Sequence, residues 1–160
     1  MKVFFDTEFI EDGVTIDLIS IGLVTEDGRT FTVASTEADL SRATSWVRAH
    51  VLPLLPPKGD PAWMSRIEIH DALIAFIGTD TPEFWGYCAD YDWVALCQLF
   101  GRMLDLPRGW PKYAHDLRQA ADEHGLTRAD YPVQDPASAH DALADARWNL
   151  ELWKTIAAHS

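Results

Sequence analysis

Two carboxylates near the N-terminus, Asp6 and Glu8, are separated by one residue directly after the apolar run of residues 2–5. Side chains at positions i and i+2 of an extended chain project from the same face, with Cα atoms roughly 7 Å apart. Two like charges held this close repel each other, and a divalent cation or a raised pKa is the usual relief. The pair therefore indicates a metal site at the end of a first strand, although a solvated surface pair would have the same spacing.

A third acid, Asp92, follows the apolar run of residues 84–88 and opens a segment with helical spacing of Val94, Leu96 and Leu99. The sequence thus places this carboxylate at the N-terminus of a helix. An N-cap role there is favoured by the helix dipole, so capping and participation in a site are both open.

His140 and Asp145 form the third candidate group, within the stretch His-Asp-Ala-Leu-Ala-Asp-Ala. Five residues along a helix rotate the chain by roughly 140°, so these two side chains cannot share one face of a continuous helix. We therefore expect His140 to reach a site from the first turn of the helix or from the loop before it. The alternative is a surface histidine followed by solvated acids.

The elements that must position these residues follow from hydrophobic spacing and from helix-capping signals. Ser65 with Glu68, and Ser138 with Asp141, match capping boxes at the starts of two helices. We expect strands at residues 2–5, 17–24, 30–34, 84–88 and 113–117, and helices at 39–50, 65–78, 91–103, up to His124-Gly125, and from 138 onward. The first three strands form an antiparallel meander. The pattern predicts an α/β fold in which a mixed five-stranded sheet is flanked by helices.

Three motifs occur together and in order: Asp6-Thr7-Glu8, Tyr91-Asp92, and the stretch from His140 to Ala146. In this order they resemble the D-x-E, F/Y-D and H-x-A-x-x-D-A patterns of the DEDDh family of 3′-5′ exonucleases, and the RNase T and oligoribonuclease type most of all. The resemblance covers essentially the whole chain. It implies a ribonuclease H-like fold and a single exonuclease domain spanning residues 1–160.

One departure from the family pattern stands out. Members commonly carry His-Asn four and five positions before the aspartate of the second motif, and this chain has Tyr87-Cys88 there. A thiol cannot replace the paired donor and acceptor of an amide.

The resemblance implies a metal-dependent 3′-5′ exoribonuclease that releases mononucleotides from the 3′ end of single-stranded RNA or a 3′ overhang. Hard oxygen ligands select Mg²⁺ or Mn²⁺, and two such ions suit in-line displacement at phosphorus. By the family's roles, Asp6 would bridge two ions, Glu8 and Asp145 would complete the nucleophile side, and Asp92 would hold the leaving-group ion. His140 is suited to accept a proton from the attacking water near neutral pH.

Three further residues are candidates for substrate contacts. Phe9 follows the first motif and could wedge beside the terminal base, and Trp63 lies where RNase T-like sequences often carry a base-stacking tryptophan. Packing in the core is the competing interpretation of both. Arg108 belongs to a basic, aromatic stretch at residues 102–112. In homodimers of the resembled type such residues help to hold substrate at the partner's site, but a solvated loop or the rim of a subunit contact is also open.

Charge and cysteine content limit the substrates and the cellular compartment that fit this chain. The 160 residues carry 25 Asp and Glu against 13 Lys and Arg, a net charge of −12, which argues against a protein that coats long duplexes and favours a short single-stranded end. Two cysteines, Cys88 and Cys97, are too few for a disulfide framework and indicate free thiols in the cytoplasm. No apolar run approaches the roughly 18 residues of a membrane span, so no membrane anchor and no export signal are expected.

Other functions remain open at this point. A 3′-5′ exodeoxyribonuclease would carry the same motifs, because the choice of RNA over DNA rests on the resemblance alone. A phosphohydrolase of small nucleotides would use the same metals. A non-catalytic RNA-binding module of the same fold is disfavoured, since a binding module has no need to maintain five chemically costly groups together.

Overall fold

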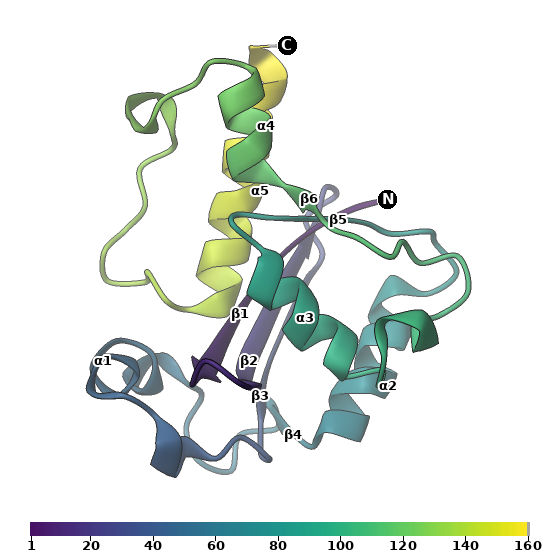
Figure 1. The fold of residues 1–160 in the computed structure, drawn as a ribbon, viewed down its shortest axis with the longest axis vertical. Coiled ribbons are helices and arrows are strands. Elements are labelled where there is room, and N and C mark those ends of the chain that lie inside the picture. Colours follow the sequence, from purple (N-terminus) through teal and green to yellow (C-terminus); the bar gives the residue numbers. More distant parts are fainter. Residues whose placement is uncertain (160) are drawn as a thin grey trace.

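The computed structural model describes residues 1–159, and at its centre lies a six-stranded sheet with the order β4-β3-β2-β1-β5-β6 (Figure 1). The strands are β1 Lys2–Glu11, β2 Ile16–Thr25, β3 Thr30–Ser35, β4 Trp63–Met64, β5 Glu83–Gly86 and β6 His115–Asp116. β1, β2 and β3 pair antiparallel, as predicted, and the three outer pairings are parallel. The mixed sheet is confirmed, but the predicted count of five is wrong. β4 has two residues, too few to show strand alternation, and it forms only by pairing with the end of β3.

The first strand is longer than the predicted span of residues 2–5. Pairing with β2 continues to Glu11, so Asp6 and Glu8 lie within the strand and not at its end. The register shifts between Glu8 and Phe9, where one extra residue of β2, Ile19, stands opposite the junction. Such a bulge bends the strand and re-aims the side chains that follow it.

Five α-helices complete the fold: α1 Ser45–His50, α2 Arg66–Ile77, α3 Asp90–Gln98, α4 Leu117–Glu123 and α5 Ala142–Ala158. The capping box of Ser65 and Glu68 at α2 is confirmed. Two helices are shorter than predicted. Thr44 caps a separate α1 after a short 3-10 turn, and α3 ends before Gly101, whose φ of 103° no helix continues. No helix within residues 1–159 is long and apolar enough to cross a membrane.

The start of α5 differs from the prediction. Asp141 alone caps the helix, accepting a hydrogen bond from the backbone N–H of Ala144, and Ser138 instead donates to the carbonyl of Asp135. The predicted capping box is wrong because residues 138–140 form a turn that ends in His140 with a φ of 72°. His140 therefore precedes the helix, as its spacing from Asp145 requires.

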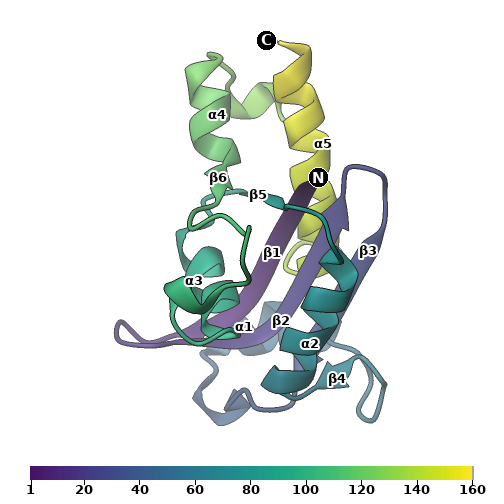
Figure 2. The same ribbon diagram turned by 90° about the vertical axis from the view of Figure 1, so that its right-hand side faces the viewer.

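Helices cover both faces of the sheet. α2 and α3 pack against residues such as Val3 and Phe5, while α5 packs against Phe4 and Val24, so successive residues of one strand serve opposite layers. Figure 1 shows α5 and α2 on opposite sides of the strands. α4 lies beside the C-terminal half of α5 (Figure 2), and Leu117 belongs to the apolar cluster between them.

A single glycine allows α5 to approach the sheet closely. A Cβ atom at Gly22 would lie 2.3 Å from the carbonyl carbon of Ala142 and 2.4 Å from the backbone nitrogen of Leu143. Gly22 is also the direct partner of Asp6 in the β1–β2 ladder. The missing side chain therefore brings the first turn of α5 to the level of the acidic pair on β1.

Candidate active site

Four carboxylates from three elements gather around the middle of β1. Asp6 and Glu8 come from the strand, Asp92 from the first turn of α3, and Asp145 from the first turn of α5. Burial raises the pKa of the Asp6 carboxyl well above its usual range, and the negative charges of the other three raise that pKa further. The structure thus brings together all four acids that the motifs singled out.

Glu8 is buried and lies close to two other potential ligands. One side-chain atom from each of Glu8, His140 and Asp145 falls within 4.8 Å of the others, a spacing that could hold a metal ion. Burial, followed by the charges of Asp145 and Asp92, raises the pKa of Glu8 from 4.5 to about 8. Crowded, destabilised carboxylates make a donor set that fits a hard divalent cation.

Asp92 is held in place by the strand and does not cap its own helix. Its Oδ1 accepts hydrogen bonds from the backbone N–H of Thr7, at 2.8 Å, and from the Thr7 hydroxyl, at 2.6 Å. The N-cap of α3 is Ala89, which makes no side-chain cap. The capping interpretation of Asp92 is therefore wrong. Burial raises its pKa, and the two hydrogen bonds from Thr7 oppose that shift.

His140 enters from the turn before α5, and its backbone is tied to the acid of the same motif. The N–H of His140 donates to Oδ2 of Asp145 at 3.0 Å. The imidazole contacts Trp46 of α1 in a T-shaped arrangement with ring centroids 4.7 Å apart, and Trp46 stacks on His50 at 4.8 Å. Trp46 is 48% exposed and lies beside His140.

Sequence reasoning missed three polar residues around the cluster. Asp141 adds negative charge that raises the pKa of both Asp6 and Glu8. The Gln134 amide donates to Asp145, and the buried amide of Asn149 donates to the carbonyl of Phe5 at 2.9 Å. Only Asn149 carried a signal, since it follows Asp145 by four residues and so shares its helix face.

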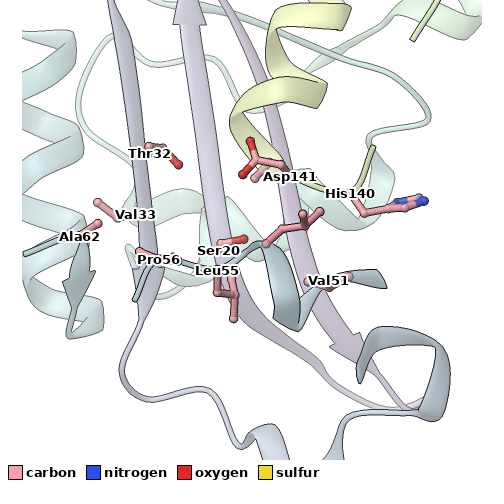
Figure 3. Close-up of a pocket in the computed structure, with 11 residues that line it drawn as sticks. Ser20, Thr32, Val33, Val51, Leu55, Pro56, Ala62, His140 and Asp141 are labelled. Atoms are coloured by element: carbon pink, nitrogen blue, oxygen red, sulfur yellow. The ribbon is translucent and has the colours of Figure 1, made fainter. Parts of the chain in front are cut away.

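Two cavities flank the carboxylates. One has a volume of about 170 Å³ and lies between the sheet, at Ser20 and Thr32, the loop at Pro56, and the turn carrying His140 and Asp141 (Figure 3). The other has a volume of about 280 Å³ and lies between β5, α5 and the segment before α5. Its lining includes Asp6, Asp145, Tyr87, Arg128, Gln134 and Trp148. The second cavity is thus lined by two of the four acids, whereas the first reaches the site through His140 and Asp141.

Tyr87 and Cys88, the departure from the family pattern, directly follow β5. Cys88 has a φ of 52°, a left-handed conformation in which asparagine and glycine are the usual residues. Tyr87 packs edge-on against Trp148, with centroids 5.3 Å apart, and against Tyr131, at 6.1 Å. The position thus supplies an aromatic wall to the second cavity.

The predicted substrate residues lie in three different surroundings. Phe9 is half-buried just past the bulge, with its ring 6.0 Å from that of Tyr91. Trp63 is half-buried in β4, and its indole N–H donates to the carbonyls of Pro56 and Pro57. Neither ring is part of the fully buried core.

Arg108 is exposed and lies away from the acids of its own chain. The neighbouring Gly109 approaches Thr81, whose carbonyl accepts a hydrogen bond from the N-terminal amino group, so Arg108 is near the opposite end of β1. Arg102 pairs with Asp105, and Lys112 donates to the carbonyl of Leu106. A single chain therefore does not bring this basic stretch to the carboxylate cluster.

Comparison with known proteins gives two kinds of relative. Residues 1–157 match the family described as the 3′-5′ exoribonuclease Rv2179c-like domain. Two proteins of Mycobacterium tuberculosis, the 3′-5′ exoribonucleases Rv2179c and MT2234.1, are each 50% identical to this chain over 159 residues, covering 98% of this chain and 93% of the relative.

Among solved structures, the zinc-bound complex of E. coli ExoI with single-stranded DNA is similar, with a TM-score of 0.69 at 12% identity. The match covers 99% of this chain and 40% of that chain. E. coli exonuclease I bound to a dT13 oligonucleotide has a TM-score of 0.62 at 14% identity, with coverage of 99% and 40%. This chain therefore spans two fifths of the length of those longer proteins and shares their ribonuclease H-like fold.

Proposed function

Because the chain belongs to the family of Rv2179c-like 3′-5′ exoribonuclease domains, it is a 3′-5′ exonuclease, and we propose that its substrate is RNA. The reaction is hydrolysis of the terminal phosphodiester bond of a single strand or 3′ overhang, with release of mononucleotides. The observation that carries the proposal is the gathering of Asp6, Glu8, Asp92 and Asp145 beside His140. This arrangement supports assignment to the DEDDh type.

The four carboxylates would hold two Mg²⁺ or Mn²⁺ ions, with Asp6 shared between them. Ions of this kind, when bound, polarise the scissile phosphate and offset the charge that develops on its oxygens. The chemistry of the donors supports this choice, since carboxylate oxygens suit Mg²⁺ and Mn²⁺ better than zinc or copper. The raised pKa values of Asp6 and Glu8 are a second support, because they record repulsion that a cation would relieve.

His140 accepts the proton of the attacking water in this mechanism. An imidazole is a side chain suited to act as a base at neutral pH, and the backbone hydrogen bond of His140 to Asp145 fixes the turn that presents the ring. Thr7 holds the Asp92 carboxylate in place by donating two hydrogen bonds to its Oδ1. The chain's own contribution is thus to hold acids and base in fixed positions.

The substrate lies along these groups with its terminal nucleotide near Phe9, which wedges beside the last base, while Trp63 offers a stacking surface. We place the whole of residues 1–160 in one exonuclease domain that acts in the cytoplasm. A two-fold homodimer would bring Arg108 of one subunit toward the acids of the other, where its charge would meet the RNA.

Digestion of 5′-end-labelled single-stranded RNA tests the function. With Mg²⁺ or Mn²⁺ we expect a ladder that shortens stepwise from the 3′ end, no cleavage in excess chelator, and a block by a 3′-terminal phosphate. DNA of the same sequence should be cut more slowly. Cleavage of circular RNA would indicate an endonuclease, hydrolysis of mononucleotides alone a phosphohydrolase, and gel retardation without cleavage a binding module.

A further inference from the structure

The cavity between β5, α5 and the segment before α5 is lined by one positively charged side chain, that of Arg128, which has no role in the proposed reaction. We propose that this cavity, called here the Arg128 cavity, binds the nucleotide on the 5′ side of the scissile bond. Arg128 contacts the phosphate of the second internucleotide linkage from the 3′ end, and the aromatic wall contacts the base. The inference rests on the proposed function and adds a substrate contact to it.

The dimensions and lining of the Arg128 cavity suit one nucleotide. Its volume of about 280 Å³ is close to the lower end of small-molecule sites, roughly 300 Å³. Asp6 and Asp145 lie in its lining, so the cavity opens directly onto the reacting groups. Tyr87 and Trp148 form an aromatic wall, and stacking or edge contact of a base on such rings is tolerant of sequence.

The charge of Arg128 is available to an anion. Arg128 is exposed at the start of the 3-10 turn Arg128–Asp130 and is the only basic residue in the cavity lining. Within residues 1–159 it forms no ion pair, whereas the nearby Arg118 is paired with Asp122 at 3.0 Å. The chain has a net charge of −12, so an arginine without a carboxylate partner is notable beside the proposed site of phosphodiester hydrolysis. Its guanidinium is suited to bind a phosphate of the substrate.

The position of Arg128 selects the second phosphate over the scissile one. Arg128, Asp6 and Asp145 line the same cavity, yet within residues 1–159 no ion pair of 4.0 Å or less joins the guanidinium to either carboxylate. Its guanidinium therefore lies beyond direct contact with the acids that must surround the scissile phosphate. The cavity beside His140, by contrast, has no Lys or Arg in its lining, as expected for a site that meets only a nucleoside without a further phosphate.

Oligoribonucleotides with one neutral methylphosphonate linkage test this contact. Wild-type protein should cleave the first bond about tenfold more slowly, in kcat/KM, when the second linkage is neutral, and at nearly the normal rate when the fourth linkage is neutral. Arg128→Gln should lower kcat/KM for the all-phosphate oligomer about tenfold and should respond less than twofold to the neutral second linkage. Arg128→Lys should fall between the two.

Arg147→Gln is the matched control, since Arg147 is an exposed arginine of α5 outside the cavity lining. It should behave as wild type with every oligomer. The assignment would be overturned if the neutral second linkage slowed wild type and Arg128→Gln by the same factor. It would also be overturned if Arg128→Gln and Arg147→Gln lost the same factor in kcat/KM. Fluorescence anisotropy with the same oligomers gives the same comparison as affinity. It therefore decides the contact even if the wild-type protein bound RNA without cutting it, which would refute the proposed function instead.

Discussion

The fold buries Glu8 and Asp6 next to other acids, and the pKa values of both carboxyls are raised because their charged forms are destabilised there. Burial comes first and neighbouring charge second for both residues. At neutral pH the metal-free protein must either keep protons on these groups or bear their repulsion. The same residues that a cation would bind are therefore a source of instability without it.

The stability of the metal-free protein should fall as pH rises. Glu8 has a pKa of about 8 in the folded chain against 4.5 in its ordinary state, so the folded state binds more protons across this range. The free energy of unfolding then decreases between about pH 4.5 and pH 8, by on the order of 3 kcal/mol, or about 5–10 °C in melting temperature. Thermal melts in chelator would measure this.

Two controls separate Glu8 from other titrating groups. Glu8→Gln should flatten the pH dependence and melt higher than wild type at pH 8 in chelator. Excess Mg²⁺ or Mn²⁺ should restore the stability of the wild-type protein at high pH, because metal binding strengthens as the carboxylates ionise. A wild-type protein that melts higher at pH 8 than at pH 5 in chelator would contradict the account.

His140→Ala should slow cleavage by about 10² or more, because the attacking water loses its base. Binding of Mn²⁺ should be largely retained, since the four carboxylates are unchanged. Single-turnover rates and metal titration measure the two effects separately. His50→Ala is a suitable control: His50 belongs to the same aromatic cluster but lies farther out, 6.4 Å from His140 between ring centroids. A wild-type rate in His140→Ala would assign the base role elsewhere.

At the scale of elements, Gly22 lets α5 approach β2 closely. Gly22→Ala would place a Cβ atom 2.3 Å from backbone atoms of Ala142, which cannot move without shifting the start of the helix. We expect a loss of about 3 kcal/mol in the free energy of unfolding and a marked loss of cleavage, since His140 and Asp145 move with the helix. Urea unfolding and activity measure both.

Thr32→Ala is the control for that change. Thr32 is the exposed cross-strand partner of Gly22 on β3, so its truncation removes atoms without a clash. It should cost less than about 1 kcal/mol and reduce cleavage far less than Gly22→Ala does. A Gly22→Ala protein as stable and active as Thr32→Ala would show that α5 does not depend on this contact.

The sequence predicted those elements whose signal is local. The antiparallel pairing of β1 with β2 and the capping box of Ser65 depend on residues that lie close together in the sequence. Both were predicted correctly. β4 was missed because its two residues are fixed by the end of β3, far away in sequence. Likewise, nothing near Trp46 indicates that it meets His140, a contact that exists only because α1 folds back over the bulged strands.

The residues of the candidate site, too, were predicted where a pattern within the sequence marks them and missed where only the fold brings them together. Motif spacing pointed to Asp6, Glu8, Asp92 and Asp145, since each acid alone has an ordinary interpretation but the order of the three motifs matches a known family. The residues that hold these acids in place by hydrogen bonds are of types that do not stand out in a sequence. Thr7, which holds Asp92, and Gln134, which holds Asp145, make bonds across the fold that no local pattern marks.

At the scale of the whole molecule, the segment around Arg108 combines charge with exposed apolar surface. Leu104 is 72% exposed and Tyr113 is 60% exposed. We expect this segment to form the contact of a two-fold dimer, so light scattering during gel filtration should give about twice the monomer mass. Leu104→Asp should reduce the mass to that of a monomer, and Arg108→Glu should weaken RNA binding more than Mn²⁺ binding.

Val14→Asp serves as the control for the dimer contact. Val14 is 90% exposed in the β1–β2 turn, outside the segment, so the variant should remain dimeric. A stable wild-type monomer with full activity would remove the dimer and leave Arg108 in a solvated loop.

The most direct test of the central claim is the single-turnover rate of 3′-end cleavage of single-stranded RNA by Asp6→Asn in Mg²⁺. Asp6 is coupled to all three other acids, so its neutral isostere disables the cluster while the fold is kept. We predict a rate at least about 10³-fold below wild type, equivalent to about 4 kcal/mol of transition-state stabilisation, together with an equal or higher melting temperature in chelator. Near-normal cleavage by a folded Asp6→Asn protein would contradict the account.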